Sequence, residues 1–428
     1  MGVGGLIGGG IFAVLGVAAE IAGNAAFLAY LIAGGVAMAS GYSYSRLTAH
    51  FDEEGGSFTF IEHYTGNENV AGLVGWTLIV GYVGTMAMYA FAFGSFAADL
   101  LVGTSGTWLR EALSIGIIVA FTGVNLMGVR ESGESQDILV YAKVAILLLF
   151  GLVGLWAIFI DHRAQLFVGG LFANGVFAPI VSIGAIFVSF EGFQLLSYEY
   201  TDIEGGLNTM EKGIYLSIAI STVIYVLVAF VTTTVLSPEQ IRQSKETVLA
   251  VAASMLFTDP LIQRIAFVLV AIAALFSTTS AINATLFGTA RLAHKVANAG
   301  ALPQLFSFRN KNGVPTWSLI IIAGLTAVFT ALGTLEEITS FASIAFALVF
   351  GTVNYICLRD SDIDRSPLIP GIGLVGTLAF LPLILWHYLR TQPAMLYSVG
   401  GIFLTLLILE LGYSERRRLE LLSFRLRN

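Results

Sequence analysis

The sequence predicts an all-α polytopic membrane protein with twelve transmembrane helices. Of its 428 residues, 56% are apolar and only 11% are charged, whereas a soluble domain averages about 25% charged residues. The mean hydropathy of +0.84 shows that the apolar residues are spread over the whole chain and not confined to one anchor. The apolar runs are also long and continuous, and a helix needs roughly 20 mostly apolar residues to cross a bilayer.

The transmembrane helices are predicted from runs that lack Asp, Glu, Lys and Arg. Eleven of the twelve predicted helices come from such runs, and the twelfth, over 138–160, contains a single lysine, Lys143. Continuous runs of this kind exclude a transmembrane β-barrel, whose strands alternate apolar and polar residues. The predicted spans are 1–19, 21–45, 70–98, 112–129, 138–160, 164–190, 213–238, 265–290, 312–335, 338–358, 366–389 and 391–409.

Charge sets the expected orientation and excludes a nucleic-acid partner. The chain has 21 basic and 28 acidic residues, a net charge of −7, so it lacks the basic footprint of a nucleic-acid binder. If both termini are cytoplasmic, fourteen Lys and Arg residues lie on the inner side and six on the outer side. Because basic loops stay inside, we expect a multi-pass protein of the cell membrane with both termini cytoplasmic. The basic C-terminal tail is expected to contact anionic membrane lipids.

The first span contains the most unusual motif, a run of glycines over residues 2–10. Each interior glycine costs a helix up to ~1 kcal/mol relative to alanine. One interpretation is close helix packing of the GxxxG kind, which uses spaced glycines. The other is a discontinuous helix, unwound near the middle of the membrane, whose free N–H groups face a cavity. We favour the second, because Gly8, Gly9 and Gly10 are consecutive.

A second interruption is expected in the sixth span, where Glu191 and Gly192 break an apolar run. An acidic residue in a span costs ~2.5–3.5 kcal/mol on insertion scales and usually marks a polar cavity. The alternative is that the helix simply ends over 187–200. Two broken spans, the first of each five-helix half, indicate a secondary transporter built from inverted repeats, with its site at the midplane.

Lys143 lies about seven residues into the fifth span, too deep to extend easily to the membrane surface. Burial disfavours the charged form of a lysine, so such a residue can exchange a proton. The alternative is a structural lysine that caps backbone carbonyls.

Enzymatic and ATP-driven functions find no support in the sequence. It contains no nucleotide-binding, HExxH or GxSxG motif, and its single cysteine, Cys357, forms no metal-ligand spacing. A membrane-embedded enzyme would need a catalytic constellation, and the spans hold too few ionisable groups. We therefore predict no catalytic residues, no metal and no cofactor.

Five segments in order along the chain resemble an amino acid permease of the amino acid–polyamine–organocation superfamily. They are GGLIGGGIF (4–12), EGGSFTFIEHYTG (54–66), SFEGFQLLSYE (189–199), LFSTTSAINATLFGTARLAHKVANAGALP (275–303) and VPTWSL (314–319). Lys143 resembles a lysine of one proton-coupled archaeal and bacterial-type branch, where it stands in for a bound sodium ion. The chain departs from the family after the sixth helix, where the family's proline is missing.

The resemblance implies a LeuT-type five-plus-five inverted repeat with discontinuous helices 1 and 6, followed by two further helices. We expect the first repeat over 1–165, the second over 166–360, and helices 11 and 12 with a basic cytoplasmic tail over 361–428. Only three residues precede the motif that begins at residue 4. We therefore expect that the native reading frame begins upstream, or that the cytoplasmic half of helix 1 is absent here.

The expected substrate is a zwitterionic amino acid bound at the two breaks. Its carboxylate should meet the N–H groups of Gly8, Gly9 and Gly10, at the positive end of the outer half-helix. By resemblance, its ammonium should meet the main-chain carbonyls of Leu6, Val188 and Glu191. Ser189 and Phe190, which lie between Val188 and Glu191, are expected to contact the substrate as well. The Glu191 side chain is expected to anchor the unwound strand through hydrogen bonds.

The expected coupling ion is a proton carried by Lys143. Its ammonium should reach a carbonyl of helix 1 near Gly4 and a hydroxyl of helix 8, with Ser277 as the family match. The sequence thus predicts a secondary amino acid transporter, coupled to protons and working by alternating access. An obligate amino acid or amine exchanger without proton coupling is the alternative.

Overall fold

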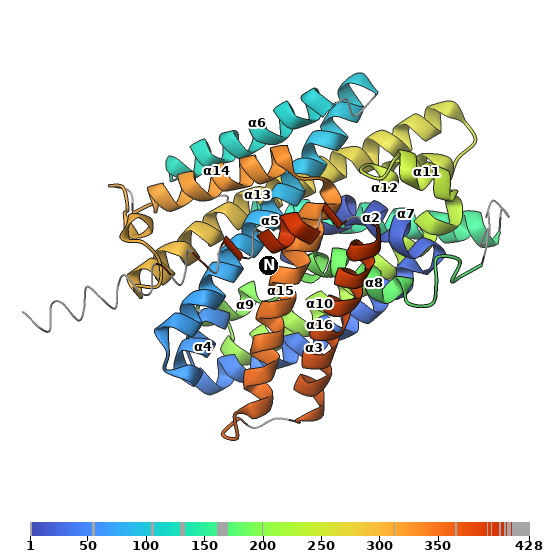
Figure 1. The fold of residues 1–428 in the computed structure, drawn as a ribbon. Helices are drawn as coiled ribbons and strands as arrows, with labels where there is room; N and C mark the ends of the chain where they lie inside the picture. The colour runs from blue at the N-terminus through green and yellow to red at the C-terminus, as the bar shows by residue number, and fades with distance from the viewer. Residues whose placement is uncertain are drawn as a thin grey trace, which may run out of the picture.

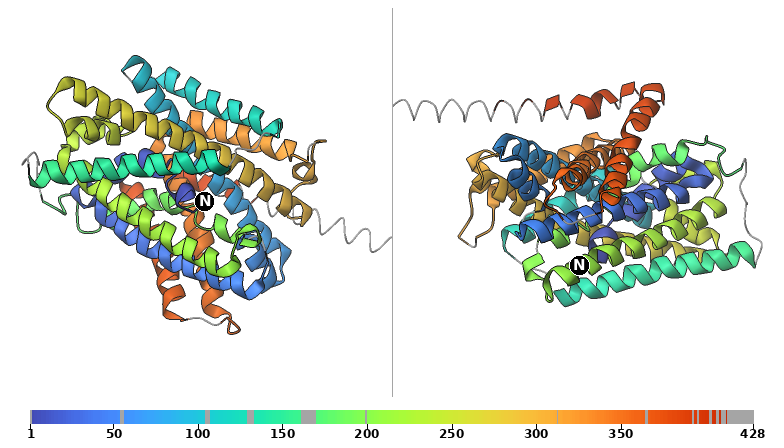
Figure 2. Two further views of the ribbon diagram at one scale, coloured as in Figure 1. Left: turned by 180° about the vertical axis from the view of Figure 1, so that it is seen from behind. Right: turned by 90° about the horizontal axis from the view of Figure 1, so that it is seen from below.

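The structure is a computed structural model that is all-helical over the part of the chain it describes. It describes residues 2–53, 56–103, 107–128, 133–160, 170–198, 200–311, 313–363 and 366–391, with 393, 394, 396–401, 404, 405, 408 and 412. Two flanks of long helices are visible in Figures 1 and 2, with α3 and α10 on one side and α6, α13 and α14 on the other.

The first half of the chain begins with a helix in two pieces. The bounds are α1 (Gly2–Leu6), α2 (Gly10–Ala22), η1 (Gly23–Ala25), α3 (Ala26–Phe51), α4 (Gly56–Thr65), α5 (Glu68–Val102), α6 (Thr107–Leu126) and α7 (Gly133–Phe159). Every residue from Gly10 to Ala19 is buried, so α2 lies inside the bundle and packs against α8.

The second half also begins with an interrupted helix. Its elements are α8 (Ala178–Ile186), η2 (Phe187–Phe190), α9 (Leu195–Tyr198), η3 (Tyr200–Asp202), α10 (Gly206–Val235), α11 (Pro238–Gln243), α12 (Val248–Met255), α13 (Pro260–Asn298), η4 (Gln304–Ser307), α14 (Thr316–Leu332), α15 (Leu335–Arg359) and α16 (Leu368–Thr391). The helix α5 is central, because it packs against α6, α13, α14 and α15.

Nine helical segments of the described chain are long and apolar enough to cross a membrane, and Thr316–Leu332 is a shorter apolar helix. One of the nine, Gly10–Phe51, joins two predicted spans, because only the short turn η1 separates α2 from α3. The last predicted span, 391–409, lies partly outside the described residues, as does the basic tail. The number of twelve transmembrane helices therefore stays a prediction.

One predicted boundary is wrong in its position. The sixth span was expected over 164–190, but in the described part of this range the helix begins only at Ala178. Gly170 and Gly175 have φ of +90° and +106°, a region that interrupts a right-handed helix. Pro179 then occupies the first turn of α8, a position at which proline favours a helix start.

Candidate transport site

The first break lies where the glycine run predicted it. The helix α1 ends at Leu6, and α2 begins at Gly10. Residues 7–9 form the turn between them, after a last α1 hydrogen bond from the Ile7 N–H to the Val3 carbonyl, 2.8 Å. The first N–H groups of α2 have no helical carbonyls before them, so this end carries partial positive charge. The three glycines Gly8, Gly9 and Gly10 therefore surround the N-terminal end of a buried half-helix.

The second break follows η2. Glu191 is extended, with φ −68° and ψ 141°, and Gly192 has φ +127°, which only glycine adopts without strain. A β-carbon added to Gly192 would lie 2.7 Å from the carbonyl carbon of Gly5. The two interrupted helices thus touch through their backbones at Gly5 and Gly192.

A single tyrosine hydroxyl binds both breaks. The hydroxyl of Tyr225 in α10 shares its one proton between the Leu6 carbonyl, at 2.6 Å, and the Ser189 carbonyl, at 3.2 Å. Sequence reasoning missed Tyr225, because a tyrosine in an apolar helix is normally a packing residue. The only signal is its hydroxyl, which needs a partner when it is buried.

The backbone of Val188 is held on both sides. Its carbonyl accepts from the Glu191 N–H at 3.1 Å, and its N–H donates to the Ser343 hydroxyl at 3.0 Å. A carbonyl oxygen has two lone pairs. Within the described part of the chain, the carbonyls of Leu6 and Val188 each accept one such hydrogen bond, so each can accept a second.

Glu191 is buried, with an exposed fraction of 3%. The hydrogen bonds that stabilise this turn belong to Gln194, whose Oε1 accepts from the Gly192 N–H at 2.8 Å and whose Nε2 donates to the Tyr82 hydroxyl at 3.2 Å. Sequence reasoning missed Gln194. The signal that could have found it is its polar side chain in an apolar span, three residues after Glu191. The anchoring role expected of Glu191 therefore stays a prediction.

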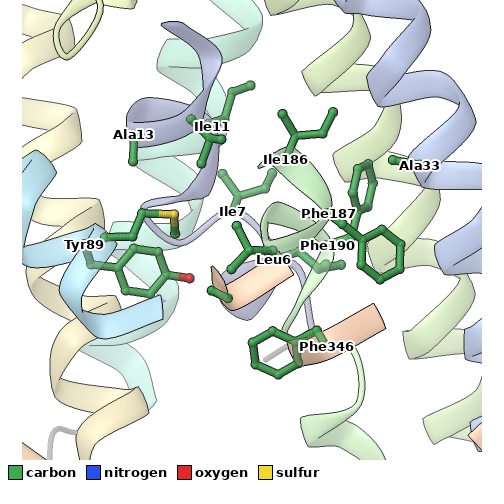
Figure 3. Close-up of a cluster of buried hydrophobic side chains, with 14 of the residues drawn as sticks. Leu6, Ile7, Ile11, Ala13, Ala33, Tyr89, Ile186, Phe187, Phe190 and Phe346 are labelled. Atoms are coloured by element: carbon green, nitrogen blue, oxygen red, sulfur yellow. The ribbon is translucent and has the colours of Figure 1, made fainter. Parts of the chain in front are cut away.

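Tyr89 of α5 packs against the glycine run. A β-carbon on Gly9 would lie 2.4 Å from Cδ1 of Tyr89, and one on Gly8 would lie 3.1 Å from its hydroxyl. Gly10 faces α8 and η2, where a β-carbon would lie 3.0 Å from Cα of Ser189. Figure 3 shows the Tyr89 hydroxyl directed toward the break, with Phe187, Phe190 and Phe346 on the opposite side. Aromatic and aliphatic side chains therefore surround the buried backbone of the two breaks.

Lys143 of α7 is 5% exposed, and its ammonium donates to the Gly4 carbonyl at 3.2 Å. This contact is the one predicted from sequence. Ser277 of α13, the partner expected on helix 8, shares its hydroxyl proton between the Ile7 carbonyl, at 3.2 Å, and the Gly8 carbonyl. Its expected role beside Lys143 stays a prediction. The freed carbonyls of the break attract this hydroxyl, so Lys143 and Ser277 bind neighbouring carbonyls and tie α7 and α13 to the same break.

Metal chemistry has no ligand set in the described part of the chain, which brings no three His, Cys, Asp or Glu residues together in a way that could hold an ion. The site instead offers partly unpaired backbone groups, one buried carboxyl group and one buried amine. Such a set suits a small ligand that carries both an anionic and a cationic group.

The chain is similar in sequence to known amino acid permeases and transporters. A family model described as amino acid permease matches residues 1–408. The inner membrane transport protein YbaT of Escherichia coli is 30% identical, over 95% of this chain and 93% of its own length. The branched-chain amino acid permease BcaP of Bacillus subtilis is 24% identical, over 89% of this chain and 84% of its own length.

The fold also resembles that of a solved transporter. The crystal structure of a manganese transporter mutant of Eremococcus coleocola matches with a TM-score of 0.58 and 12% identity, over 96% of this chain and 92% of that chain. At this identity, the likeness concerns the fold alone. Together with the apolar helices, these matches identify a multi-pass membrane protein.

Proposed function

The chain belongs to the amino acid permease family, as a transporter and not an enzyme, and we propose that it carries a zwitterionic amino acid together with a proton. The observation that carries the proposal is the contact between the buried ammonium of Lys143 and the Gly4 carbonyl, 3.2 Å, at the break of the first helix. This contact joins a titratable side chain to α1, the helix whose broken end would bind the substrate.

The substrate carboxylate would bind the N–H groups of Gly8, Gly9 and Gly10. The position of these residues at the start of the buried helix α2 supports this, because a helix N-terminus favours an anion. The substrate ammonium would bind the carbonyls of Leu6, Val188 and Glu191, with Ser189 and Phe190 completing the wall.

The proton would be carried by Lys143. When protonated, its ammonium makes a charge-assisted hydrogen bond to Gly4, worth about 1.5–3 kcal/mol. When neutral, the amine loses that charge, and α7 is tied less strongly to α1. Because 1.4 kcal/mol is a factor of ten in an equilibrium, protonation would shift the balance between two conformations by tenfold or more. The hydroxyl of Ser277 would keep α13 attached to the same break.

Transport would follow by alternating access, in which one bundle of helices rocks against the other around this fixed site. The protein would lie in the cell membrane with both termini in the cytoplasm, as the distribution of Lys and Arg indicates.

The direct test is uptake of a panel of radiolabelled amino acids into proteoliposomes, with and without an inward proton gradient. We expect concentrative uptake of at least one neutral amino acid that collapses when the gradient is removed. Uptake that requires an internal amino acid and ignores the gradient would instead identify the exchanger, and no uptake of any amino acid would contradict the substrate class.

A further inference from the structure

Lys245 joins two helices at the end of the molecule that the charge distribution assigns to the outside. It lies between α11 and α12, and its ammonium pairs with Glu20 near the end of α2 and with Glu336 at the start of α15, the latter at 3.1 Å. Glu336 is largely buried, with a side-chain exposure of 9%. One cation therefore lies between carboxylates that belong to two different helices.

The two residues after Lys245 fasten the same loop to a third helix. Glu246 accepts from the Ser95 hydroxyl at 3.0 Å, and the Thr247 hydroxyl donates to Asp99 at 2.9 Å. Both partners are in α5. Three consecutive loop residues thus connect α2, α15 and α5.

The backbone of the loop is pressed onto α2 at Gly16. A β-carbon on Gly16 would lie 1.9 Å from the Lys245 carbonyl oxygen, so only glycine allows this contact. Gly16 and Glu20 are four residues apart and share one face of α2. Ala13, three residues before Gly16, lies on that face too and is fully buried.

The positive charge of Lys245 is stabilised by the two carboxylates around it. Burial alone would lower the pKa of Lys245, but the carboxylates of Glu336 and Glu20 outweigh burial and raise it, so the ammonium stays charged. Without Lys245, the two carboxylates would repel each other across the joint between α2 and α15.

We propose that Lys245 is a positioning residue of the transport cycle: with Glu20 and Glu336 it forms an outer latch that holds α2 against α15 and α5 and closes the outer path to the site. The proposal rests on transport by alternating access. For the outer path to open, the half-helix α2 has to move away from α15, and the ion pairs of the outer latch have to break first. This structure has the outer latch closed.

The test measures how fast a thiol beneath the outer latch reacts with a membrane-impermeant maleimide from the outer side. The parent protein carries Cys357→Ser and a probe, Ala13→Cys, in right-side-out vesicles without substrate. We expect Lys245→Met to raise the labelling rate about tenfold over the parent and Lys245→Arg to leave it close to the parent. Arg264→Met is the matched control, because Arg264 of α13 is an exposed cation of the same outer side whose guanidinium lies over the Phe267 ring, 6.0 Å from its centroid; it should change nothing.

Two further measurements keep the result unambiguous. A second probe, Ala347→Cys, is fully buried in α15 and should stay unlabelled in Lys245→Met, since its labelling would report general unfolding. If Lys245→Met does not fold, Glu336→Gln breaks the outer latch from the other side and should give the same increase at Ala13→Cys.

Equal labelling of the parent and of a folded variant that lacks the outer latch would overturn the proposal. Because labelling is measured without substrate, this result is independent of which substrate is carried. Failure to find amino acid uptake would contradict the proposed function but not the outer latch. Unchanged labelling with normal uptake would contradict the outer latch but not the proposed function.

Discussion

Gly192 of the second break lies so close to Gly5 of the first that a β-carbon on Gly192 would be 2.7 Å from the Gly5 carbonyl carbon. The two breaks therefore contact each other through backbone at these glycines. At this joint, side chains bind backbone groups that a regular helix would satisfy, as Tyr225 does for the Leu6 carbonyl and Gln194 for the Gly192 N–H. A change at the joint should affect folding and transport together.

Gly192→Ala should be strongly destabilising. A non-glycine residue at positive φ costs roughly 1–3 kcal/mol, and here the contact with Gly5 adds a steric clash. Gly103→Ala is the matched control, because Gly103 also has positive φ but no atom within 4 Å of its β-carbon position. Thermal unfolding in detergent should show a clearly larger loss for Gly192→Ala, and equal losses would mean that the joint tolerates a side chain.

Tyr225→Phe should weaken both breaks at once. The change removes the donor to the Leu6 and Ser189 carbonyls, and leaving buried acceptors unpaired costs about 1–3 kcal/mol. Tyr215→Phe is the control, because Tyr215 lies in the same helix α10 and its hydroxyl donates to Glu211 of that helix at 3.1 Å. We expect a lower melting temperature and slower uptake for Tyr225→Phe only. The account of this tyrosine fails if the two variants behave alike.

Sequence reasoning located the two breaks but not what holds them. The glycine run and the pair Glu191–Gly192 are local signals, because glycine and an acid disfavour a regular helix in a membrane wherever they occur. The contact of Tyr225 with Leu6 joins residues 219 positions apart, and a tyrosine in an apolar run gives no periodic signal. Lys143 was found because a charge in a span is conspicuous.

The carbonyl partners of Ser277 could not be predicted for a similar reason. Its place on helix 8 near the first break followed from the resemblance, but the choice between Lys143 and the carbonyls of Ile7 and Gly8 depends on the path of the unwound backbone. That path depends on contacts between distant parts of the chain, which local sequence patterns do not reveal.

Gln194 should matter more than Glu191 for holding the second break. Gln194→Leu removes the acceptor of the Gly192 N–H and the donor to Tyr82, so uptake should fall at least about tenfold, the equivalent of about 1.4 kcal/mol. Glu191→Gln has nearly the same shape and keeps polar atoms at the site, so uptake of neutral amino acids should stay within about threefold. If the Glu191→Gln protein reversed the preference between lysine and alanine as transported substrates, the charge of Glu191 would select the substrate instead.

Gly16→Ala should act through the outer latch. The added methyl group would meet the Lys245 carbonyl oxygen and push the loop away from α2, so maleimide labelling at Ala13→Cys should rise as in Lys245→Met. Gly35→Ala in α3, where the β-carbon meets no atom within 4 Å, is the control and should be neutral or slightly stabilising, because alanine favours a helix by up to ~1 kcal/mol. Slow labelling in a folded Gly16→Ala protein would mean that the loop does not seal α2.

The most direct test of the central claim is the dependence of uptake on the proton gradient in Lys143→Ala, with Lys212→Ala, an exposed lysine of α10, as the control. Proteoliposomes would be loaded at fixed internal pH and assayed over a range of external pH with the amino acid that the parent protein concentrates. If Lys143 carries the proton, Lys143→Ala loses concentrative uptake and its pH dependence but retains exchange of internal for external substrate, while Lys212→Ala behaves like the parent protein. Concentrative uptake by Lys143→Ala with undiminished pH dependence would show that the lysine is only structural and that the proton binds elsewhere.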